Sequence, residues 1–330
     1  MESPLLQLPG AVPADAPDQE VAAHYGEPSQ EQRALEAGTA FVDRSDRGVL
    51  RVSGPDRLSW LHSLLSQHLE RLAPGEATQA LLLSPHGHVE HHLHLVDDGE
   101  AVWVHVEPGT APELAAFLDK MRFMLRVEVE DLSDAYAVVT TPREAAPGVP
   151  VFPDVVGTAQ IIERTVLPGL AEELRPAGLW AYEALRIAAH VPRFGLDTDH
   201  RSIPHEMGWI EAAVHLEKGC YRGQETVARV HNLGRPPRRL VFLHLDGSVD
   251  RLPAHGDPVE IPGGRAVGFV GSAARHHELG PVALALVKRN VPVDAELLAG
   301  GVAAAQEVVV SPDTGANAKI DLRRQPAKRA

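Results

Sequence analysis

Apolar residues recur in this chain at two spacings, one that fits strands and one that fits helices. Stretches in which apolar and polar residues alternate predict strands at 48–53, 77–83, 89–96 and 101–106. Apolar residues three and four positions apart predict helices at 31–37, 58–72, 110–125 and 179–189. Helices and strands therefore alternate unevenly, which favours an α+β fold over a doubly wound parallel sheet.

The last part of the chain has a different pattern of apolar runs and turns. Beyond residues 235–237, short β-prone runs at 240–245, 266–270 and 282–287 alternate with turns rich in glycine and proline. This pattern predicts a small β-barrel or sandwich at the C-terminal end. The segment 141–153 is also rich in proline and glycine, and we expect it to be a loop between subdomains.

Length and charge restrict the kind of protein that the sequence encodes. A chain of 330 residues exceeds what one hydrophobic core usually covers, so two or three domains are expected. A net charge of -14 argues against a protein that coats nucleic acid or an anionic membrane. No stretch approaches the ~20 apolar residues of a membrane span. We therefore expect neither membrane association nor direct nucleic-acid binding.

The single cysteine, Cys220, restricts the chemistry further. One thiol can neither close an intramolecular disulfide nor supply the several thiolates of a structural zinc or iron-sulfur site, so we expect no stable metal of the protein's own. Residues 1–20, rich in proline and acidic residues, predict a disordered leader, and the basic residues of 316–330 predict a solvated tail. A reducing, cytoplasmic location is the expectation.

Cys220 lies between Lys218 and Arg222, with Gly219 and Gly223 beside it. Neighbouring positive charge favours the thiolate, and glycines leave the backbone open to a ligand or partner. The alternative is a small buried hydrophobe, the environment of most free cysteines. Motifs of dinucleotide-binding, P-loop, α/β-hydrolase and zinc-protease proteins are absent from the sequence.

Two further stretches carry candidate chemistry. On a strand at 89–96, His92 and His94 would share one face with His88 and Glu90, which suits either a transition metal or a polar cavity wall. The stretch 186–209 ends a helix and enters a glycine-bearing loop rich in charged residues. Such a loop lines a ligand cleft or forms a surface network of ion pairs.

The segment KGCYRGQE, residues 218–225, resembles the signature K-G-C-[FY]-x-G-Q-E of YgfZ-type proteins, folate-binding relatives of the glycine-cleavage T-protein that support iron-sulfur enzymes. Other segments agree with that family in their order along the chain, from about Val21 to Val310. These segments are 43–45, 50–54, the leucine-rich helix from Asp56, 84–87, Arg186 with 192–197, Pro204, Glu206 and 268–272.

The resemblance implies a three-part, cloverleaf-like α+β architecture, in which two α+β lobes surround a central folate-binding channel and a β-barrel follows. Residues 21–50 and 141–237 would form a discontinuous first lobe that carries the cysteine motif. Residues 51–140 would form the second lobe, and residues 238–315 the barrel.

The resemblance also implies a function and a set of site residues. The protein would bind tetrahydrofolate and support the assembly or repair of iron-sulfur enzymes, and through them tRNA modification. Its partners would be folate and iron-sulfur client enzymes or cluster-assembly proteins. Cys220, Lys218 and Arg222 would form the reactive site, and the folate contacts would be Arg186, His92, Glu206, Tyr221, Gln224 and Glu225.

Two departures from the T-protein pattern distinguish this chain. His91 and His92 stand where T-proteins have an acidic pair, and the helix-end pattern 186–190 lacks the glutamate that contacts the pterin. A neutral imidazole supplies no fixed negative charge, although it can shuttle a proton. A folate-dependent aminomethyl or methyl transferase is therefore the alternative to an accessory factor, and a folate sensor without catalysis is a third hypothesis.

Overall fold

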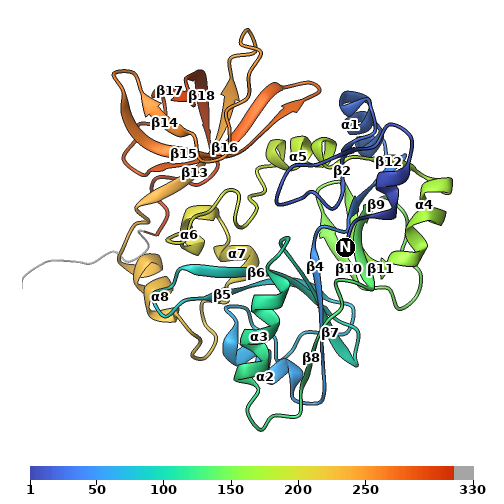
Figure 1. Cartoon of the computed structure of the whole chain (residues 1–330). Helices are drawn as coiled ribbons and strands as arrows, with labels where there is room; N and C mark the ends of the chain where they lie inside the picture. Colours follow the sequence, from blue (N-terminus) through green and yellow to red (C-terminus); the bar gives the residue numbers. More distant parts are fainter. Residues whose placement is uncertain (316–330) are drawn as a thin grey trace, which may run out of the picture.

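Two five-stranded sheets and one closed barrel organise residues 1–315, the part of the chain that the computed structural model describes. Figure 1 shows the three parts set around a common centre, with the barrel on one side and the two sheets on the other. The α+β class and the C-terminal barrel expected from the sequence are confirmed.

The first sheet has the strand order β10-β11-β9-β3-β12. Its strands are β3 (Ala40–Arg44), β9 (Tyr136–Thr141), β10 (Val151–Asp154), β11 (Gly157–Glu163) and β12 (Arg175–Ala177). Its helices are α1 (Pro28–Glu36), α4 (Leu167–Glu173) and α5 (Leu179–Ala188). Leu35, Val42 and Leu185 share one buried cluster, so α1 and α5 cover the end of this sheet at which β12 runs parallel to β3.

The second sheet is antiparallel and has the order β5-β6-β7-β4-β8. Its strands are β4 (Gly48–Ser53), β5 (Ala77–Leu83), β6 (Val89–Asp97), β7 (Ala101–Val106) and β8 (Glu128–Asp131). Helices α2 (Arg57–Leu64) and α3 (Ala111–Met121) cover one face. Leu61 and Leu118 pack there against Leu93 and Leu95 of β6.

The barrel closes in the order β13-β16-β15-β14-β17-β18. Its strands are β13 (Arg238–Leu245), β14 (Pro258–Ile261), β15 (Arg265–His276), β16 (Gly280–Lys288), β17 (Glu296–Ala299) and β18 (Val302–Val308). Val241 and Leu243 of β13 fill the barrel, whereas Leu240 and Phe242 pack against Met207 and Trp209 outside it. Burial on both faces explains why the run Leu240–Leu243 is continuously apolar.

Three short helices connect the first sheet to the barrel: α6 (Pro204–Met207), α7 (Ile210–Ala213) and α8 (Gln224–Asn232). The segment 218–225 follows α7 and runs into the first turn of α8. Lys218 and Arg222 attach it to the second lobe, whereas the resemblance implied a place in the first lobe. Gly223 and Gly87 both have positive φ, and a Cβ on Gly223 would lie 2.6 Å from the Ser84 carbonyl oxygen. Both glycines are therefore required by one close backbone contact.

The chain changes sheet a few residues before the predicted lobe limits. β4 begins at Gly48 and belongs to the second sheet, although residues up to 50 were expected in the first lobe. β9 begins at Tyr136 and already belongs to the first sheet, although the second lobe was expected to extend to residue 140.

The prediction of a disordered leader at 1–20 is wrong. This segment contains η1 (Pro4–Gln7) and β1 (Val12–Pro13), which pairs with β2 (Ala22–His24). Leu5 is 2% exposed and packs in the same cluster as Phe41 and Val139 of the first sheet. One apolar side chain among the prolines and acids thus anchors the segment. The basic tail 316–330 lies outside the described residues.

Two predicted helices are shorter than their apolar spacing indicated. α2 ends at Leu64, and Leu65, Leu69 and Leu72 enter the same core from non-helical backbone. α3 ends at Met121, and Leu125 is exposed.

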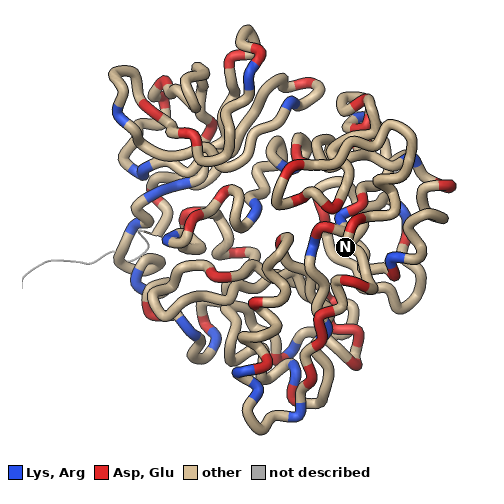
Figure 2. Tube along the Cα trace, in the orientation of Figure 1, with Lys and Arg blue, Asp and Glu red and all other residues tan. Residues whose placement is uncertain are grey.

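Charged residues of both signs are spread over all three parts (Figure 2). Within residues 1–315, no helix has the length and apolar character needed to cross a membrane.

Candidate functional site

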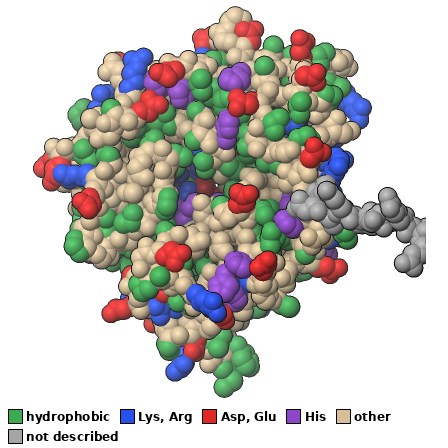
Figure 3. All heavy atoms as spheres, turned by 180° about the vertical axis from the view of Figure 1, so that it is seen from behind, with side chains coloured by type: hydrophobic (Ala, Val, Ile, Leu, Met, Phe, Trp, Pro, Cys, Tyr) green, Lys and Arg blue, Asp and Glu red, His purple; other side chains and the backbone are tan. Residues whose placement is uncertain are grey.

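A cavity of about 460 Å³ lies where the two sheets meet the connecting helices and the end of the barrel domain. Its wall includes residues of all of these parts: Arg44, Arg47, His92, His105, Glu107, Asp154, Tyr182, Arg186, Arg193, Met207, Trp209 and Val310. The opposite face from Figure 1 is hollowed near its centre, with histidine and charged side chains visible at depth (Figure 3). This volume falls within the ~300–1,000 Å³ of small-molecule pockets.

A column of aromatic rings forms one side of the cavity. The ring centroids are 4.5 Å apart for Trp209 and His92, 4.7 Å for His92 and His94, 4.6 Å for His94 and His105, and 4.7 Å for His105 and Phe152. Burial lowers the pKa of His92 to about 4, and burial also lowers the pKa of His94 and of His105 well below the usual value. The three imidazoles are therefore neutral near pH 7.

The expectation that His88, Glu90, His92 and His94 share one face is wrong. A β-bulge between Leu82 and Leu83 leaves Glu90 without a partner on β5, so that the alternation shifts by one residue. His92 and His94 line the cavity, whereas Glu90 pairs with Arg222 at 2.8 Å. Across residues 1–315, the groups spaced for a metal ion lie elsewhere.

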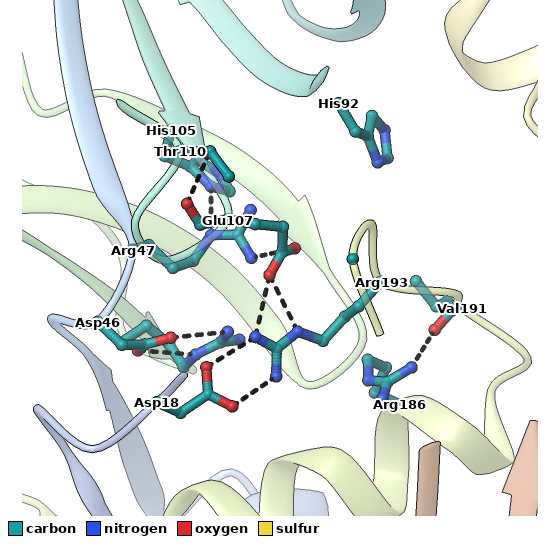
Figure 4. A network of polar contacts seen from close by, with 12 residues as sticks. Asp18, Asp46, Arg47, His92, His105, Glu107, Thr110, Arg186, Val191 and Arg193 are labelled. Atoms are coloured by element: carbon teal, nitrogen blue, oxygen red, sulfur yellow. Dashed lines mark hydrogen bonds and ion pairs between the residues drawn. The ribbon is translucent and has the colours of Figure 1, made fainter. Parts of the chain in front are cut away.

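Buried ion pairs adjoin the ring column at His105 and form another part of the cavity wall (Figure 4). Arg47 donates from Nη1 to Glu107 at 2.7 Å and from Nε to His105 Nδ1 at 2.8 Å. Arg193 joins Glu107 at 3.0 Å to Asp18 of the N-terminal segment at 2.8 Å. Although burial alone raises the pKa of Glu107, the charges of Arg47 and Arg193 lower it well below its ordinary value.

Arg186 lines the cavity as predicted, but its guanidinium is already engaged by the protein. It donates to the Val191 carbonyl at 2.8 Å and to Asp197 at 3.0 Å, and it pairs with Glu183. Asp197 in turn accepts from the Ser272 hydroxyl at 2.7 Å. Arg186 thus holds the loop that follows α5 against the barrel, and its role toward a ligand stays a prediction.

Sequence reasoning missed Asp154, Tyr182 and Thr140, which face the cavity from the first lobe. Asp154 accepts hydrogen bonds from the Tyr182 hydroxyl at 3.0 Å and from the Thr140 hydroxyl at 2.8 Å. Asp154 and Glu107 are the carboxylates in the described cavity wall. Asp154 is the last residue of β10 and follows Pro153, and its place at the cavity depends on the pairing of β10 with β11, so no sequence pattern identified it.

Cys220 is exposed and does not line the cavity. Tyr221 shares a buried cluster with Met207 and Trp209, which belong to the cavity wall. The cysteine segment is therefore connected to that wall through one buried apolar cluster. Its exposure excludes the small buried hydrophobe that the sequence left open.

The cations beside Cys220 are engaged by other groups, contrary to the role expected for them. Lys218 is 6% exposed, and its ammonium donates to the carbonyls of His62, Leu65 (2.5 Å) and Gln67 (3.1 Å) at the end of α2. Burial lowers the pKa of Lys218 to about 8. Arg222 pairs with Glu90 on β6. Lys218 and Arg222 thus fasten the segment to the second lobe, and a thiolate at Cys220 stays a prediction.

The other predicted folate contacts lie away from the cavity wall, apart from His92 and Arg186. Glu206 is fully buried, accepts from the Ile203 N–H and pairs with Arg238 at 2.8 Å, so it holds α6 to the barrel. Gln224 donates to the Lys218 carbonyl at 3.2 Å. Glu225 is exposed on α8. The structure therefore brings two of the nine predicted residues, His92 and Arg186, to the cavity.

Known proteins resemble this chain in sequence and in structure. No protein-family model matches the chain. An aminomethyltransferase of Nostoc sp. is 27% identical over 82% of this chain and 83% of its own length. A mitochondrial iron-sulfur cluster assembly factor, the IBA57 homolog of Mycosarcoma maydis, is 26% identical over 60% of this chain and 55% of its own length. A chloroplastic transferase-like protein of Arabidopsis thaliana is 27% identical over 64% of this chain and 57% of its own length.

The alignments thus span little more than half of the length of the plant and fungal proteins. The crystal structure of the glycine cleavage system aminomethyltransferase T from Bartonella henselae superimposes with a TM-score of 0.79. It is 19% identical, and the match covers 96% of this chain and 98% of the bacterial one. The three-part arrangement around a central cavity is thus the fold of the glycine-cleavage T-protein superfamily, and this chain has that fold.

Proposed function

We propose that this protein is a cytoplasmic, YgfZ-type folate-binding factor that supports the assembly or repair of iron-sulfur enzymes, with Cys220 as its reactive group. The observation that carries the proposal is the complete KGCYRGQE segment, whose one cysteine is exposed on a T-protein fold. Similarity to an iron-sulfur cluster assembly factor supports the same role. An effect on tRNA modification would follow indirectly, through iron-sulfur client enzymes.

The residues of the cavity wall fit a reduced folate. Trp209 and the neutral ring of His92 offer faces for a flat heterocycle, and Asp154 offers carboxylate oxygens to its amino and N–H groups. Arg44 and Arg47 in the wall suit an anionic end of the ligand. Tetrahydrofolate, when bound, would supply a carrier for one-carbon groups or a reduced ring beside the cysteine segment.

Neutral histidines change what the cavity wall can do for such a ligand. His92 donates from Nε2 to the Gln79 side-chain oxygen at 2.8 Å and holds no negative charge. A carboxylate at this position would stabilise a developing cation on the folate, whereas an imidazole moves a proton or fills space. The wall therefore favours binding of folate over aminomethyl transfer.

The direct test of folate binding is calorimetric titration with tetrahydrofolate under anaerobic conditions. We expect wild-type and Cys220→Ser protein to bind equally, because Cys220 is outside the cavity, and Asp154→Asn to bind at least tenfold more weakly. Asp246→Asn, at an exposed position on the barrel, is the matched control. Wild-type protein that binds no tetrahydrofolate would refute the folate assignment.

Similarity to aminomethyltransferases favours the second candidate, a folate-dependent C1 transferase in which His92 and Arg186 act on a substrate in the cavity. The discriminating measurement is formation of 5,10-methylenetetrahydrofolate from an aminomethyl donor. Turnover that falls with His92→Phe and is unaffected by Cys220→Ser would establish the transferase. Absence of turnover with tetrahydrofolate bound would favour the accessory factor.

A further inference from the structure

Three histidines and a glutamate gather where α2 ends, beneath the cysteine segment. His62 lies in the last turn of α2, His68 and Glu70 follow it, and His215 precedes Lys218 by three residues. The ring centroids are 4.7 Å apart for His62 and His68 and 5.3 Å apart for His68 and His215. These residues belong neither to the central cavity nor to the KGCYRGQE motif.

The ligand atoms of His62, His68 and Glu70 all lie within 4.8 Å of one another. Nitrogen and oxygen ligands sit about 2.0–2.2 Å from a transition-metal ion, so two of them on one ion are at most about 4.4 Å apart. Small side-chain rotations therefore bring all three atoms onto one ion. Glu70 is exposed and His62 and His68 are half-buried, so an ion reaches the group from solvent.

The backbone around this group is held by buried hydrogen bonds. The Lys218 ammonium donates to the carbonyls of His62 and Leu65, which ends α2 at this point. The Ser66 carbonyl accepts from the His215 N–H at 3.0 Å, and the Ser66 hydroxyl donates to the Ala213 carbonyl at 2.6 Å. The same contacts that place the cysteine segment therefore fix the backbone that carries the ligands.

Unused ligand capacity remains in this group. His215 packs on His68, and its Nδ1 is buried without a hydrogen-bond partner among the described residues. His62 Nδ1 accepts a hydrogen bond of 3.2 Å from the Leu69 N–H, which coordination at that ring would break. Glu70 supplies negative charge to offset Lys218, whose ammonium is directed at the carbonyls.

We propose that His62, His68 and Glu70 bind a divalent transition-metal ion beneath the Cys220 segment, with positions left open for an exogenous ligand. Two imidazoles and one carboxylate with open positions are the ligand set that non-haem Fe(II) prefers. The ion class follows from these ligands alone; its use in iron-sulfur chemistry rests on the proposed function. Lys218 donates to the carbonyls of His62 and Leu65, next to the proposed ligands, and it lies two residues before Cys220. The same contacts would therefore hold the metal ion and the thiol in one structural unit.

The second group with metal-ligand spacing, Glu36 with His276 and His277, provides a matched control. Its ligand atoms are already used by the protein: His277 Nε2 contacts Glu36 at 2.6 Å, and His276 Nδ1 accepts from the N–H groups of Glu278 and Leu279. We therefore expect it to bind metal far more weakly.

The test is anaerobic titration of the tag-free full chain with Co(II), followed by its visible d–d absorption, and with Fe(II) in equilibrium dialysis. We expect about one ion per chain, at least tenfold weaker binding in His68→Gln and in Glu70→Gln, and unchanged binding in His276→Gln. Circular dichroism and tetrahydrofolate titration check that each variant is folded.

Wild-type protein that binds no more metal than the His62→Gln/His68→Gln variant would overturn the site, as would an equal loss in His276→Gln. The outcome is separable from the proposed function. If the protein binds tetrahydrofolate but no metal, the metal site is refuted and the proposed function stands. If it binds metal but no tetrahydrofolate, the metal site stands and the proposed folate-binding function is refuted.

Discussion

The central cavity and the Cys220 segment are built in opposite ways. The cavity is surrounded by buried charges and neutral rings that bond to one another and hold a fixed shape. The segment keeps an exposed thiol, buries the Lys218 ammonium in the fold and pairs Arg222 with Glu90 at a partly exposed position. The cavity wall is therefore closed by internal contacts, whereas the thiol of the segment is open to solvent.

The largest effect on stability is expected at Arg193. Its replacement by methionine removes a buried cation that pairs with Asp18, Glu107 and Glu183. Glu107 keeps Arg47 and Glu183 keeps Arg186, whereas Asp18 loses its ion-pair partner. Breaking such a network by removing one partner costs about 3–5 kcal/mol. Urea denaturation of Arg193→Met and of the exposed control Arg251→Met measures the difference. Equal stability of the two variants would show that the network does not hold the cavity.

Acid is expected to destabilise the cavity next most strongly. The folded pKa of His92 is about 4 against 6.5 for the free side chain, so the unfolded chain binds the proton between these values. Stability is then fully present above about pH 6.5 and is lost as the pH falls toward 4, by at most about 3 kcal/mol for this group. His94 and His105 act in the same direction.

The measurement is the free energy of unfolding from pH 7 to 4 in wild-type protein and His92→Phe, which keeps a ring against Trp209. The variant should lose less stability than wild type over this range. Parallel curves would mean that folding leaves the pKa of His92 unchanged.

A smaller loss of stability is expected at Lys218, which attaches the cysteine segment to the second lobe. Lys218→Met leaves the carbonyls of His62, Leu65 and Gln67 without their donor, and unsatisfied buried groups cost about 1–3 kcal/mol. Hydrogen exchange should show faster opening at 215–225 and unchanged protection in the barrel, with exposed Lys120→Met as the control. A uniform loss of protection would contradict local fastening.

The sequence predicted those features of the fold that local patterns determine. The strands at 48–53, 77–83 and 101–106 lie where alternation placed them, because each buries one face on a core. The prediction of a helix over 58–72 is wrong, because Leu65, Leu69 and Leu72 enter the core from a non-helical segment. Lys218, 153 residues from Leu65 in the sequence, donates to the Leu65 carbonyl and so caps this segment. No local spacing contains that contact.

The same reason limited prediction of the candidate site. The cysteine motif was found because its residues are contiguous, and His92 and His94 because they lie on one strand. Asp154 and the N-terminal contact of Asp18 with Arg193 were missed, because only tertiary pairing brings them to the cavity. The role expected of Lys218 failed for a related reason: proximity in sequence to a thiol does not give the direction in which a long side chain points.

The smallest structural effect is expected at Cys220 itself, where an exposed thiol replaced by serine should change stability by less than about 0.5 kcal/mol. That makes Cys220→Ser the sharpest probe of the account. A strain lacking the gene is complemented with wild type, Cys220→Ser or the nearby exposed variant Glu217→Gln, and iron-sulfur enzyme activities are assayed at equal protein levels. We predict that wild type and Glu217→Gln restore these activities and that Cys220→Ser does not; equal restoration by all three would contradict a role for the thiol.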